Sequence, residues 1–332
     1  MAGSQSMRAA VLEKAGTPFR LTTIARPVPQ PGQVLVRIIA SGVNPLDLKI
    51  RSGSAAHARH PLPAILGIDL AGVVETVGPG VTTFRAGDEV YGMTGGVGGV
   101  QGSLAEYAAV DADLLALKPS NFSMREAAAL PLVFITAWEG LVDRANVRAG
   151  QSVLVQGGTG GVGQYAIQIA RAEGATVYAT HSAGRSELVE RLGATPIDST
   201  TTVEDFVATH TAGRGFDIVC DTAGGASLDA SFKAVARFGH VVSALGWGTH
   251  ALAPLSFRAG TYSGVFTLLP LLTGEGKAHH GDILREAAHF AEAGTIAPFV
   301  DSRSFDLTSI DKAHALVEAR QANGKVVINV AG

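Results

Sequence analysis

The segment at residues 152–170, SVLVQGGTGGVGQYAIQIA, constrains the fold of this chain more than any other. Its β-branched run predicts a short strand, and the apolar pattern after the glycines predicts a helix. Between them, Gly158, Gly160 and Gly163 match the pattern Gly-x-Gly-x-x-Gly. A tight turn of this kind points free backbone N–H groups at a pyrophosphate, which any Cβ would keep at a distance. Because a strand precedes the glycines and a helix follows them, the match is specific.

The rest of the chain predicts an α/β protein of about two domains, since its length is 332 residues. Short strand-like runs separated by Pro- and Gly-rich turns indicate a small barrel or sandwich at 34–40, 72–77, 88–91 and 104–110. Strands and helices then alternate, which is typical of a doubly wound parallel sheet. The strands are expected at 152–156, 176–180, 218–221 and 240–245, and the helices at 126–129, 135–143, 164–173, 185–192 and 228–236.

A further helix at 283–293 and a final strand at 325–330 no longer follow the strand–helix alternation and indicate that the chain returns to the β-rich domain. We therefore expect a nucleotide-binding domain over 126–266, inserted into a discontinuous β-rich domain made of 1–125 and 267–332. The formal net charge of −3 and the lack of basic runs give no reason to expect nucleic acid or an anionic membrane as a partner. The chain shows no apolar signal segment, which predicts a cytoplasmic protein. Its single cysteine, Cys220, is expected to be an inert core thiol.

The identity of the dinucleotide depends on the end of the second strand of the sheet, about 20 residues after the glycines. Thr180, Ser182 and Arg185 stand there without a neighbouring acid. Hydroxyls and a guanidinium would accept a 2′-phosphate, which favours NADP(H); alternatively, Arg185 is a solvated helix-end residue. The other residues expected to contact the cofactor through the turn and the later loops are Thr159, Gly161, Val162, Thr222 and Leu245.

Several further segments carry a family resemblance: SGVNPLDLKIRSG at 41–53, LGIDLAGVV at 66–74, AGDEVYG at 86–92, FITAW at 134–138 and NGKVV at 323–327. With the glycine turn, they make the chain resemble the zinc-independent quinone oxidoreductase (zeta-crystallin-like) branch of the medium-chain dehydrogenases/reductases. The resemblance covers nearly the whole length. It implies a GroES-like β-rich catalytic domain, a Rossmann domain, a homodimer and an oxidoreductase that uses NADP(H).

The resemblance also bears on metal binding. Zinc-dependent relatives place Cys and His in the first two segments, where this chain has Asn44, Asp47 and, in place of the expected His, Ile68. A catalytic zinc needs about three N or S ligands from the protein, so we predict that no metal is bound. The remaining histidines do not change this, because His57 and His60 are expected in one surface loop and His279 and His280 in another.

The candidate catalytic residues follow from the same segments. Asn44 is expected near the nicotinamide of the cofactor or the substrate oxygen, where it could donate a hydrogen bond to a developing enolate. The alternative is that it only forms an Asx turn with Pro45. Lys49 stands where quinone-reductase relatives often have Tyr, so the proton donor is either Lys49 or water. Asp47 is expected to pin its loop through backbone hydrogen bonds.

Two residues from other segments are expected at the cofactor by the same resemblance. Thr136 matches a position beside the nicotinamide ribose, or it is a helix-interior Thr bonded to its own backbone. Lys325 is preferred to Arg320 as a residue that reaches the cofactor. Asp198 stands where relatives often have a Tyr on the adenosine phosphate, and a carboxylate there would weaken the case for NADP(H) unless it points away.

The expected activity is hydride transfer to a small activated molecule, either a quinone or the C=C bond of an α,β-unsaturated carbonyl. Two alternatives stay open at this point. One is an enoyl-thioester reductase, for which the chain shows no obvious cluster of basic residues to hold a phosphopantetheine arm. The other is a protein that binds NADPH without catalysis.

Overall fold

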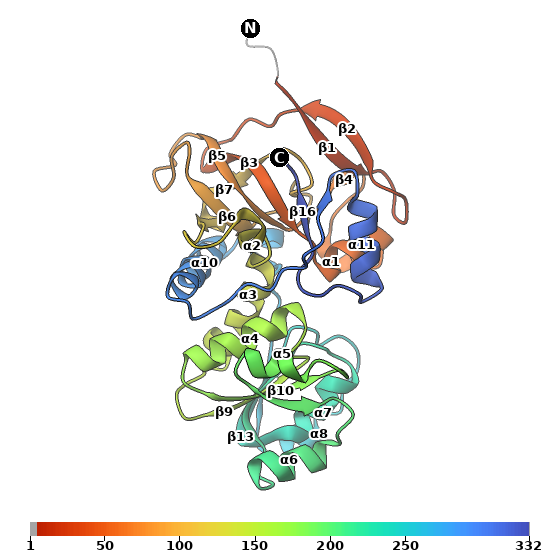
Figure 1. Cartoon of the computed structure of the whole chain (residues 1–332), viewed down its shortest axis with the longest axis vertical. Coiled ribbons are helices and arrows are strands. Elements are labelled where there is room, and N and C mark those ends of the chain that lie inside the picture. The colour runs from red at the N-terminus through yellow and green to blue at the C-terminus, as the bar shows by residue number, and fades with distance from the viewer. Residues whose placement is uncertain (1–4, 332) are drawn as a thin grey trace. The chain divides into compact units, whose positions relative to one another are not determined.

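The computed structural model of the protein describes residues 5–331, and the chain divides into two compact units (Figure 1). The first segment of unit 1 ends at Leu132 and its second begins at Leu268, while unit 2 spans Val133–Thr267. The sequence pattern instead placed the boundaries after residues 125 and 266. Helix α2 (Met124–Ala128) falls in unit 1 because it packs against β3 (Gln33–Gly42) and β5 (Asp69–Val77).

Unit 1 is β-rich, as the spacing of its turns predicted. A largely antiparallel seven-stranded sheet has the order β15-β16-β3-β5-β6-β8, with β7 paired to β3, and a smaller sheet has the order β2-β1-β4. The remaining strands are β1 (Ser6–Leu12), β2 (Arg20–Ala25), β4 (Ala64–Ile65), β6 (Glu89–Met93), β7 (Tyr107–Asp111), β8 (Leu115–Leu117), β15 (Phe305–Asp306) and β16 (Val327–Asn329).

The helices of unit 1 depart from the prediction in one respect that matters for metal binding. Helix α10 (Lys277–Glu292) begins six residues before the predicted start, so His279 and His280 lie in a helix and not in a surface loop. The interpretation of His280 as a solvated residue was wrong, because it is buried. The other helices are α1 (Pro45–Ser52), η1 (Ala56–Ala58), η2 (Ala112–Leu114), α9 (Leu269–Thr273) and α11 (Ile310–Glu318).

Unit 2 contains a six-stranded parallel sheet in the order β11-β10-β9-β12-β13-β14. Numbered along the chain this is 3-2-1-4-5-6, the doubly wound order in which ligands bind where the winding reverses, here between β9 and β12. Four strands confirm the prediction: β9 (Ser152–Gln156), β10 (Thr176–His181), β12 (Phe216–Asp221) and β13 (Val235–Ser243). Two edge strands were not predicted, because β11 (Thr195–Asp198) and β14 (Thr261–Gly264) are short and carry Pro196 and Gly264.

Helices cover the sheet of unit 2. The predicted single helix at 135–143 is instead α3 (Pro131–Trp138) followed by the π-helix η3 (Glu139–Arg144), in which Ala145 N donates to Gly140 O at 3.0 Å. The remaining helices are α4 (Gly161–Ala172), α5 (Ser186–Arg191), α6 (Val203–Thr211), which was not predicted, α7 (Ala226–Ala234) and α8 (Ala253–Ser256).

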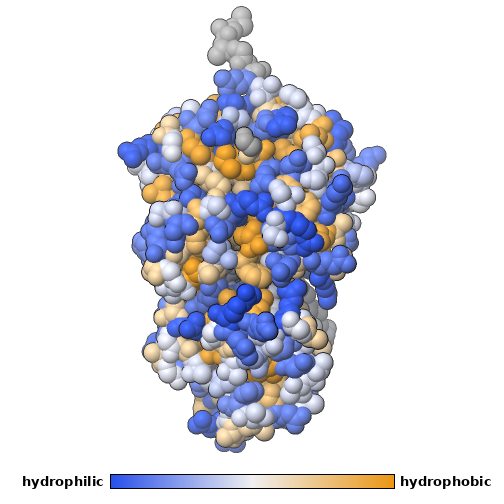
Figure 2. Space-filling model, viewed as in Figure 1, coloured by the Kyte–Doolittle hydropathy of each residue, from blue (hydrophilic) through white to orange (hydrophobic). Residues whose placement is uncertain are grey.

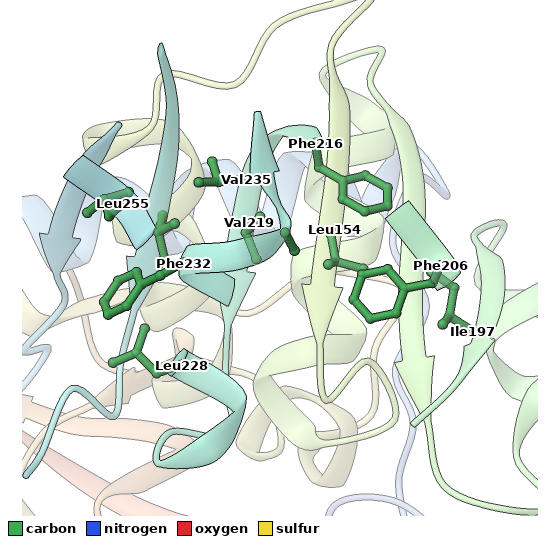
Figure 3. Packing of buried hydrophobic residues seen from close by; sticks show 11 residues of the cluster. Leu154, Ile197, Phe206, Phe216, Val219, Leu228, Phe232, Val235 and Leu255 are labelled. Atoms are coloured by element: carbon green, nitrogen blue, oxygen red, sulfur yellow. The ribbon is translucent and has the colours of Figure 1, made fainter. Parts of the chain in front are cut away.

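One face of the sheet in unit 2 packs an apolar core against α6 and α7. Leu154 and Val219 from the central strands lie among Phe206, Phe216 and Phe232 (Figure 3), and the rings of Phe206 and Phe216 are 6.2 Å apart. On the molecular face shown in Figure 2, apolar residues are interspersed with polar ones over both units. No helix within residues 5–331 is long and apolar enough to span a membrane.

Candidate functional site

The glycine turn after β9 packs too tightly for side chains. A Cβ on Gly163 would lie 2.2 Å from the carbonyl oxygen of Gly157, and one on Gly158 would lie 2.6 Å from Ala179 Cβ. Gly157 itself has φ +79°, which favours glycine. In this turn, backbone packs directly against backbone. The glycines of the motif are required because the space has no room for a Cβ.

Free N–H groups follow directly from this geometry. Gly160 is the N-cap of α4, so the N–H groups of Gly161, Val162 and Gly163 fall in the first turn, where no helical carbonyl precedes them. Directly after the neighbouring strand β12, Thr222 Oγ1 donates to Gln156 O at 2.7 Å and so holds the start of the next loop beside the turn. A helix N-terminus at the reversal point of a parallel sheet is a site for an anion such as a diphosphate.

The residues predicted to hold a 2′-phosphate occupy the end of β10 and the start of α5. Thr180 is buried, and its hydroxyl accepts a hydrogen bond from Gly157 N at 2.9 Å, so its first role is to fix the glycine turn. Ser182 is exposed, and Arg185 is the N-cap of α5. The carboxylate of Asp198 accepts from Thr200 N and Oγ1 of its own turn at 2.8 and 2.7 Å, and these bonds lower its pKa.

Asp221 is a site residue that the sequence analysis missed. It is buried at the end of β12, where its carboxylate accepts from Gly224 N at 3.0 Å and from Ser243 Oγ at 2.7 Å. Ser243 Oγ in turn accepts from Leu245 N at 3.1 Å. One carboxylate thus ties together the two loops, at Thr222 and at Leu245, that the sequence predicted to face the cofactor.

In unit 1, three segments far apart in the sequence converge on a second polar cluster. Asn44 Nδ2 donates to Asp69 Oδ2 at 2.9 Å, and Lys325 Nζ donates to Asn44 Oδ1. Lys325 Nζ also lies 3.5 Å from Asp69 Oδ2. Asp69 Oδ1 accepts from Leu132 N at 3.0 Å. The Asn44 carboxamide thereby has hydrogen-bond partners at both ends, and Asn44 is also the N-cap of α1, which begins at Pro45.

Asp47 completes this cluster by capping α1. Its carboxylate accepts from Asn44 N at 2.8 Å and so fixes the start of α1 through the backbone. Burial raises the pKa of Asp47 to about 7, while the backbone hydrogen bond from Asn44 opposes that rise. Burial also raises the pKa of Asp69. Burial lowers the pKa of Lys325, and the charges of Asp69 and Asp47 oppose that decrease.

Other predicted residues lie outside this cluster. Lys49 is exposed on α1, and within residues 5–331 its ammonium makes neither a hydrogen bond nor an ion pair. Arg320 is likewise exposed, whereas Lys325 belongs to the cluster. Thr136 lies in unit 2, buried in α3, where its hydroxyl is 3.1 Å from that of Thr267, which donates to Glu139.

One feature of the sequence could have identified Asp69 as a member of the unit 1 cluster. It is an acidic residue between Ile68 and Leu70 in an otherwise apolar run, and a buried charge of this kind needs partners. Those partners could not be named, because Lys325 lies 256 residues away. Within the described range 5–331, no three His, Cys, Asp or Glu residues gather to hold a metal ion. Ile68, where zinc-dependent relatives have His, is fully buried.

Comparison with known proteins identifies related sequences for both units. Residues 30–120 match the alcohol dehydrogenase GroES-like domain, and residues 192–328 match a family described as zinc-binding dehydrogenase. The chain is 38% identical to the 2-methylene-furan-3-one reductase of Solanum lycopersicum, over 93% of this chain and 74% of that protein. It is also 38% identical to a chloroplastic NADPH-dependent alkenal/one oxidoreductase of Arabidopsis thaliana, over 89% of this chain and 72% of that protein.

A solved structure extends the likeness to the whole fold. An alcohol dehydrogenase superfamily protein from Novosphingobium aromaticivorans is 61% identical, with a TM-score of 0.97. The match covers 98% of this chain and 100% of that one.

Proposed function

Because this chain belongs to the medium-chain dehydrogenase/reductase (alcohol dehydrogenase) superfamily, we propose that it is an NADPH-dependent, zinc-independent reductase. Its substrates are small molecules with an electrophilic carbon, namely α,β-unsaturated carbonyl compounds or quinones. The names of the two curated relatives favour reduction of the C=C bond, since one is a methylene-furanone reductase and the other an alkenal/one oxidoreductase.

The observation that carries this proposal is the glycine turn between β9 and α4. A Cβ at Gly158 or Gly163 would fill it, and its first-turn N–H groups suit a diphosphate. Ser182 and Arg185 suit a 2′-phosphate because a hydroxyl and a guanidinium form charge-assisted hydrogen bonds with it. The Asp198 carboxylate, which would repel a phosphate, is held by Thr200. The residues present therefore fit NADPH.

NADPH supplies a hydride when it is bound, and the protein supplies position and charge stabilisation. Holding a reacting carbon close to the hydride is worth effective concentrations of about 10⁵–10⁸ M in well-oriented systems, so a strong acid or base is not required. The Asp221–Ser243 pair holds the loops at Thr222 and Leu245 in place for this task. In unit 1, the hydrogen bonds from Asn44 to Asp69 and from Lys325 to Asn44 hold these side chains in fixed orientations.

A direct assay tests the proposal. NADPH oxidation at 340 nm would be followed with an alkenone, a benzoquinone, a short acyl thioester and a simple ketone, each with NADH as the parallel reductant. We expect turnover with the alkenone or the quinone, preferring NADPH, and none with the ketone. A dominant rate with the thioester would instead support the enoyl-thioester alternative. NADPH binding without turnover of any compound would support the non-catalytic one.

Two finer points belong to the same proposal. We expect a homodimer, as the family resemblance implies, and size-exclusion chromatography with light scattering would measure the mass in solution. A cytoplasmic location also stays a prediction of the sequence, and one of the curated relatives is described as chloroplastic.

A further inference from the structure

A doubly wound domain distinguishes its dinucleotides at the end of the second strand of the sheet, and in unit 2 that position is held by His181. Strand β10 ends at this histidine, about 20 residues after the glycine turn. Domains that use NAD place a carboxylate there, on the 2′-hydroxyl of the ribose. Thr180 and Ser182 were expected at a 2′-phosphate, whereas the histidine between them was not.

The strand geometry places His181 beside the glycine turn. Alternate residues of a strand share one face of the sheet, so His181 lies on the same face as Ala179. Gly158 packs against that face, because a Cβ on Gly158 would lie 2.6 Å from Ala179 Cβ. Helices α4 and α5 both pack against β10 (Figure 1). His181 is therefore two residues beyond the contact with the turn, toward the carboxyl end of the strand.

One ring nitrogen of His181 is fixed by the backbone, and the other is available. Nδ1 lies 3.0 Å from Ser182 O. A carbonyl oxygen can only accept, so Nδ1 carries a proton and donates it. Nε2 has no partner within residues 5–331 and keeps contact with solvent, although the residue as a whole is only 8% exposed. Ser182 O also accepts from Arg185 N at 3.2 Å, which fixes the ring relative to the start of α5.

Few charged groups surround this end of β10. Asp198 pairs with His181 across β10 and β11, and Arg185 and Glu187 stand at the start of α5. Neither β9 nor the glycine turn carries a charged residue, and the one charged residue of α4, Arg171, lies in its last turn. Histidine is the side chain that ordinarily changes its charge between pH 5 and 8. Of these residues, His181 is therefore the one that can gain a positive charge near neutral pH.

We propose that His181 selects NADPH over NADH, because its protonated ring donates a hydrogen bond from Nε2 to the 2′-phosphate. The inference rests on the proposed function. A neutral ring with its proton on Nδ1 would present a lone pair to the phosphate, so Nε2 takes up a proton from water when NADPH binds. The bound state then contains an imidazolium, whose Nδ1–H still donates to Ser182 O. A hydrogen bond between two charged groups is short and strong.

A purely structural role for His181 makes a different prediction. In that case the ring would only hold the carbonyl group of Ser182 and with it the loop before α5. Its loss would weaken every nucleotide that binds at the glycine turn, with or without a 2′-phosphate. No proton would be taken up on binding. The difference between NADPH and NADH, measured at several pH values, therefore separates the two roles.

The experiment compares the full-length wild type with H181Q, H181D, D198N and the control H210Q. Calorimetry would give the Kd for NADPH, NADH and adenosine 2′,5′-bisphosphate at pH 6, 7 and 8. Repeating each titration in buffers of different ionisation enthalpy gives the number of protons taken up. The bisphosphate carries the 2′-phosphate without a nicotinamide. His210 packs against Tyr178 in the same unit, so H210Q controls for the loss of a histidine elsewhere on β10 and its neighbours.

In wild type we expect NADPH and the bisphosphate to bind with proton uptake. Their affinity should rise as the pH is lowered from 8 to 6, by at most about tenfold per pH unit. A phosphate that meets positive charge can only release its own proton, so the uptake must come from the protein. NADH should show neither effect. D198N and H210Q should keep the uptake, which would exclude the neighbouring carboxylate as its source.

The variants at position 181 should lose this behaviour. In H181Q, the Kd for both 2′-phosphate compounds should rise about 10- to 100-fold at pH 6, the proton uptake should vanish, and the Kd for NADH should stay unchanged. H181D, whose carboxylate can accept from a 2′-hydroxyl, should bind NADH more tightly than NADPH.

Three results would overturn the inference. One is an H181Q protein that keeps both the preference for NADPH and the proton uptake. Another is an equal loss of NADPH and NADH affinity in H181Q. The third needs no variant to fold: wild type that binds NADPH without taking up a proton. Failure of the proposed function looks different, because wild type would then bind NADPH with proton uptake but reduce neither enones nor quinones. Wild type that binds no nucleotide would refute both.

Discussion

The two units build their polar sites in different ways. In unit 2 the site consists of backbone: consecutive residues of one turn supply the N–H groups, and glycines allow the close approach. In unit 1 it consists of side chains from three segments, joined by hydrogen bonds between Asn44 and residues 25 and 281 positions away. A site made of consecutive backbone groups appears in the sequence as a recognisable motif. A site made of side chains that the fold brings together appears in the sequence only as isolated residues.

The two sites also differ in how they respond to change. A backbone site tolerates changes in side-chain chemistry but not in side-chain volume. The unit 1 cluster has the opposite sensitivity, because its buried carboxylates and ammonium depend on one another for charge balance. Substitutions and pH should therefore affect the two units differently, and four predictions make this contrast measurable.

The largest effect is expected from Gly163→Ala in unit 2. The new Cβ would lie 2.2 Å from Gly157 O and 2.8 Å from Gly158 Cα, so the turn must open. Overpacking of this kind costs about 1–3 kcal/mol or more, so we expect NADPH affinity to fall by about 100-fold, measured by fluorescence titration. The unit 1 cluster should be unaffected, because Gly163 lies in unit 2.

Gly140→Ala is the matched control in the same unit. Its Cβ would meet Val242 and Val265 at 3.5 and 3.6 Å, which are ordinary van der Waals distances. NADPH affinity should stay close to wild type in this variant. Equal losses in the two variants would mean that unit 2 responds to any added methyl group, and the backbone site would then have no special packing requirement.

This contrast explains what the sequence could and could not predict. The glycine turn was predicted because its strand, turn and helix signals follow one another directly, from β9 (Ser152–Gln156) to α4 (Gly161–Ala172). The four central strands of unit 2 were predicted from local apolar runs of the same kind. The edge strands β11 and β14 were missed because they are four residues long and lack an apolar alternation. In the unit 1 cluster, Asn44, Asp47 and Lys325 were named individually, but Asp69 was not, because only the folded chain shows what it contacts.

The second prediction concerns the choice between NADPH and NADH. Arg185→Ala removes the guanidinium at the start of α5, and a hydrogen bond to a charged group is worth about 1.5–3 kcal/mol. We expect NADPH affinity to fall about 10- to 100-fold and NADH affinity to stay unchanged, by calorimetry. Arg191→Ala, at the exposed end of the same helix, should change neither. Equal weakening of both nucleotides in Arg185→Ala would assign the residue to the solvated alternative.

The third prediction uses acid to separate the two units. His314 is buried in α11 of unit 1 against Phe19, and burial lowers its pKa from 6.5 to about 3. Between these two pH values His314 is protonated in the unfolded chain but stays neutral in the folded chain. The free energy of unfolding therefore falls as the pH is lowered from about 6.5 to 3. The slope reaches at most about 1.4 kcal/mol per pH unit, in the window where only the unfolded form is protonated.

Urea unfolding at pH 7, 6, 5 and 4 measures this dependence. His314→Phe should flatten it, whereas replacing the exposed His289 by Gln should leave it unchanged. The loss should appear first in probes of unit 1, because the buried histidine lies there. A dependence that His314→Phe leaves intact would assign the acid sensitivity to other groups, the buried carboxylates of the cluster among them.

The smallest effect is expected at Cys220, the one cysteine of the chain, in the central strand β12 of unit 2. Burial, with a smaller contribution from the charge of Asp221, raises the pKa of its thiol to about 12. The thiolate is the reactive form, so the folded protein should not react with 5,5′-dithiobis(2-nitrobenzoate) at pH 8, while the protein in guanidinium should release one equivalent. Added NADPH should change nothing, because the thiol belongs to the packed sheet and not to the backbone site beside it. Rapid labelling of the native protein, slowed by NADPH, would instead show that unit 2 opens around its cofactor site, and the rigid backbone site inferred for this unit would have to be abandoned.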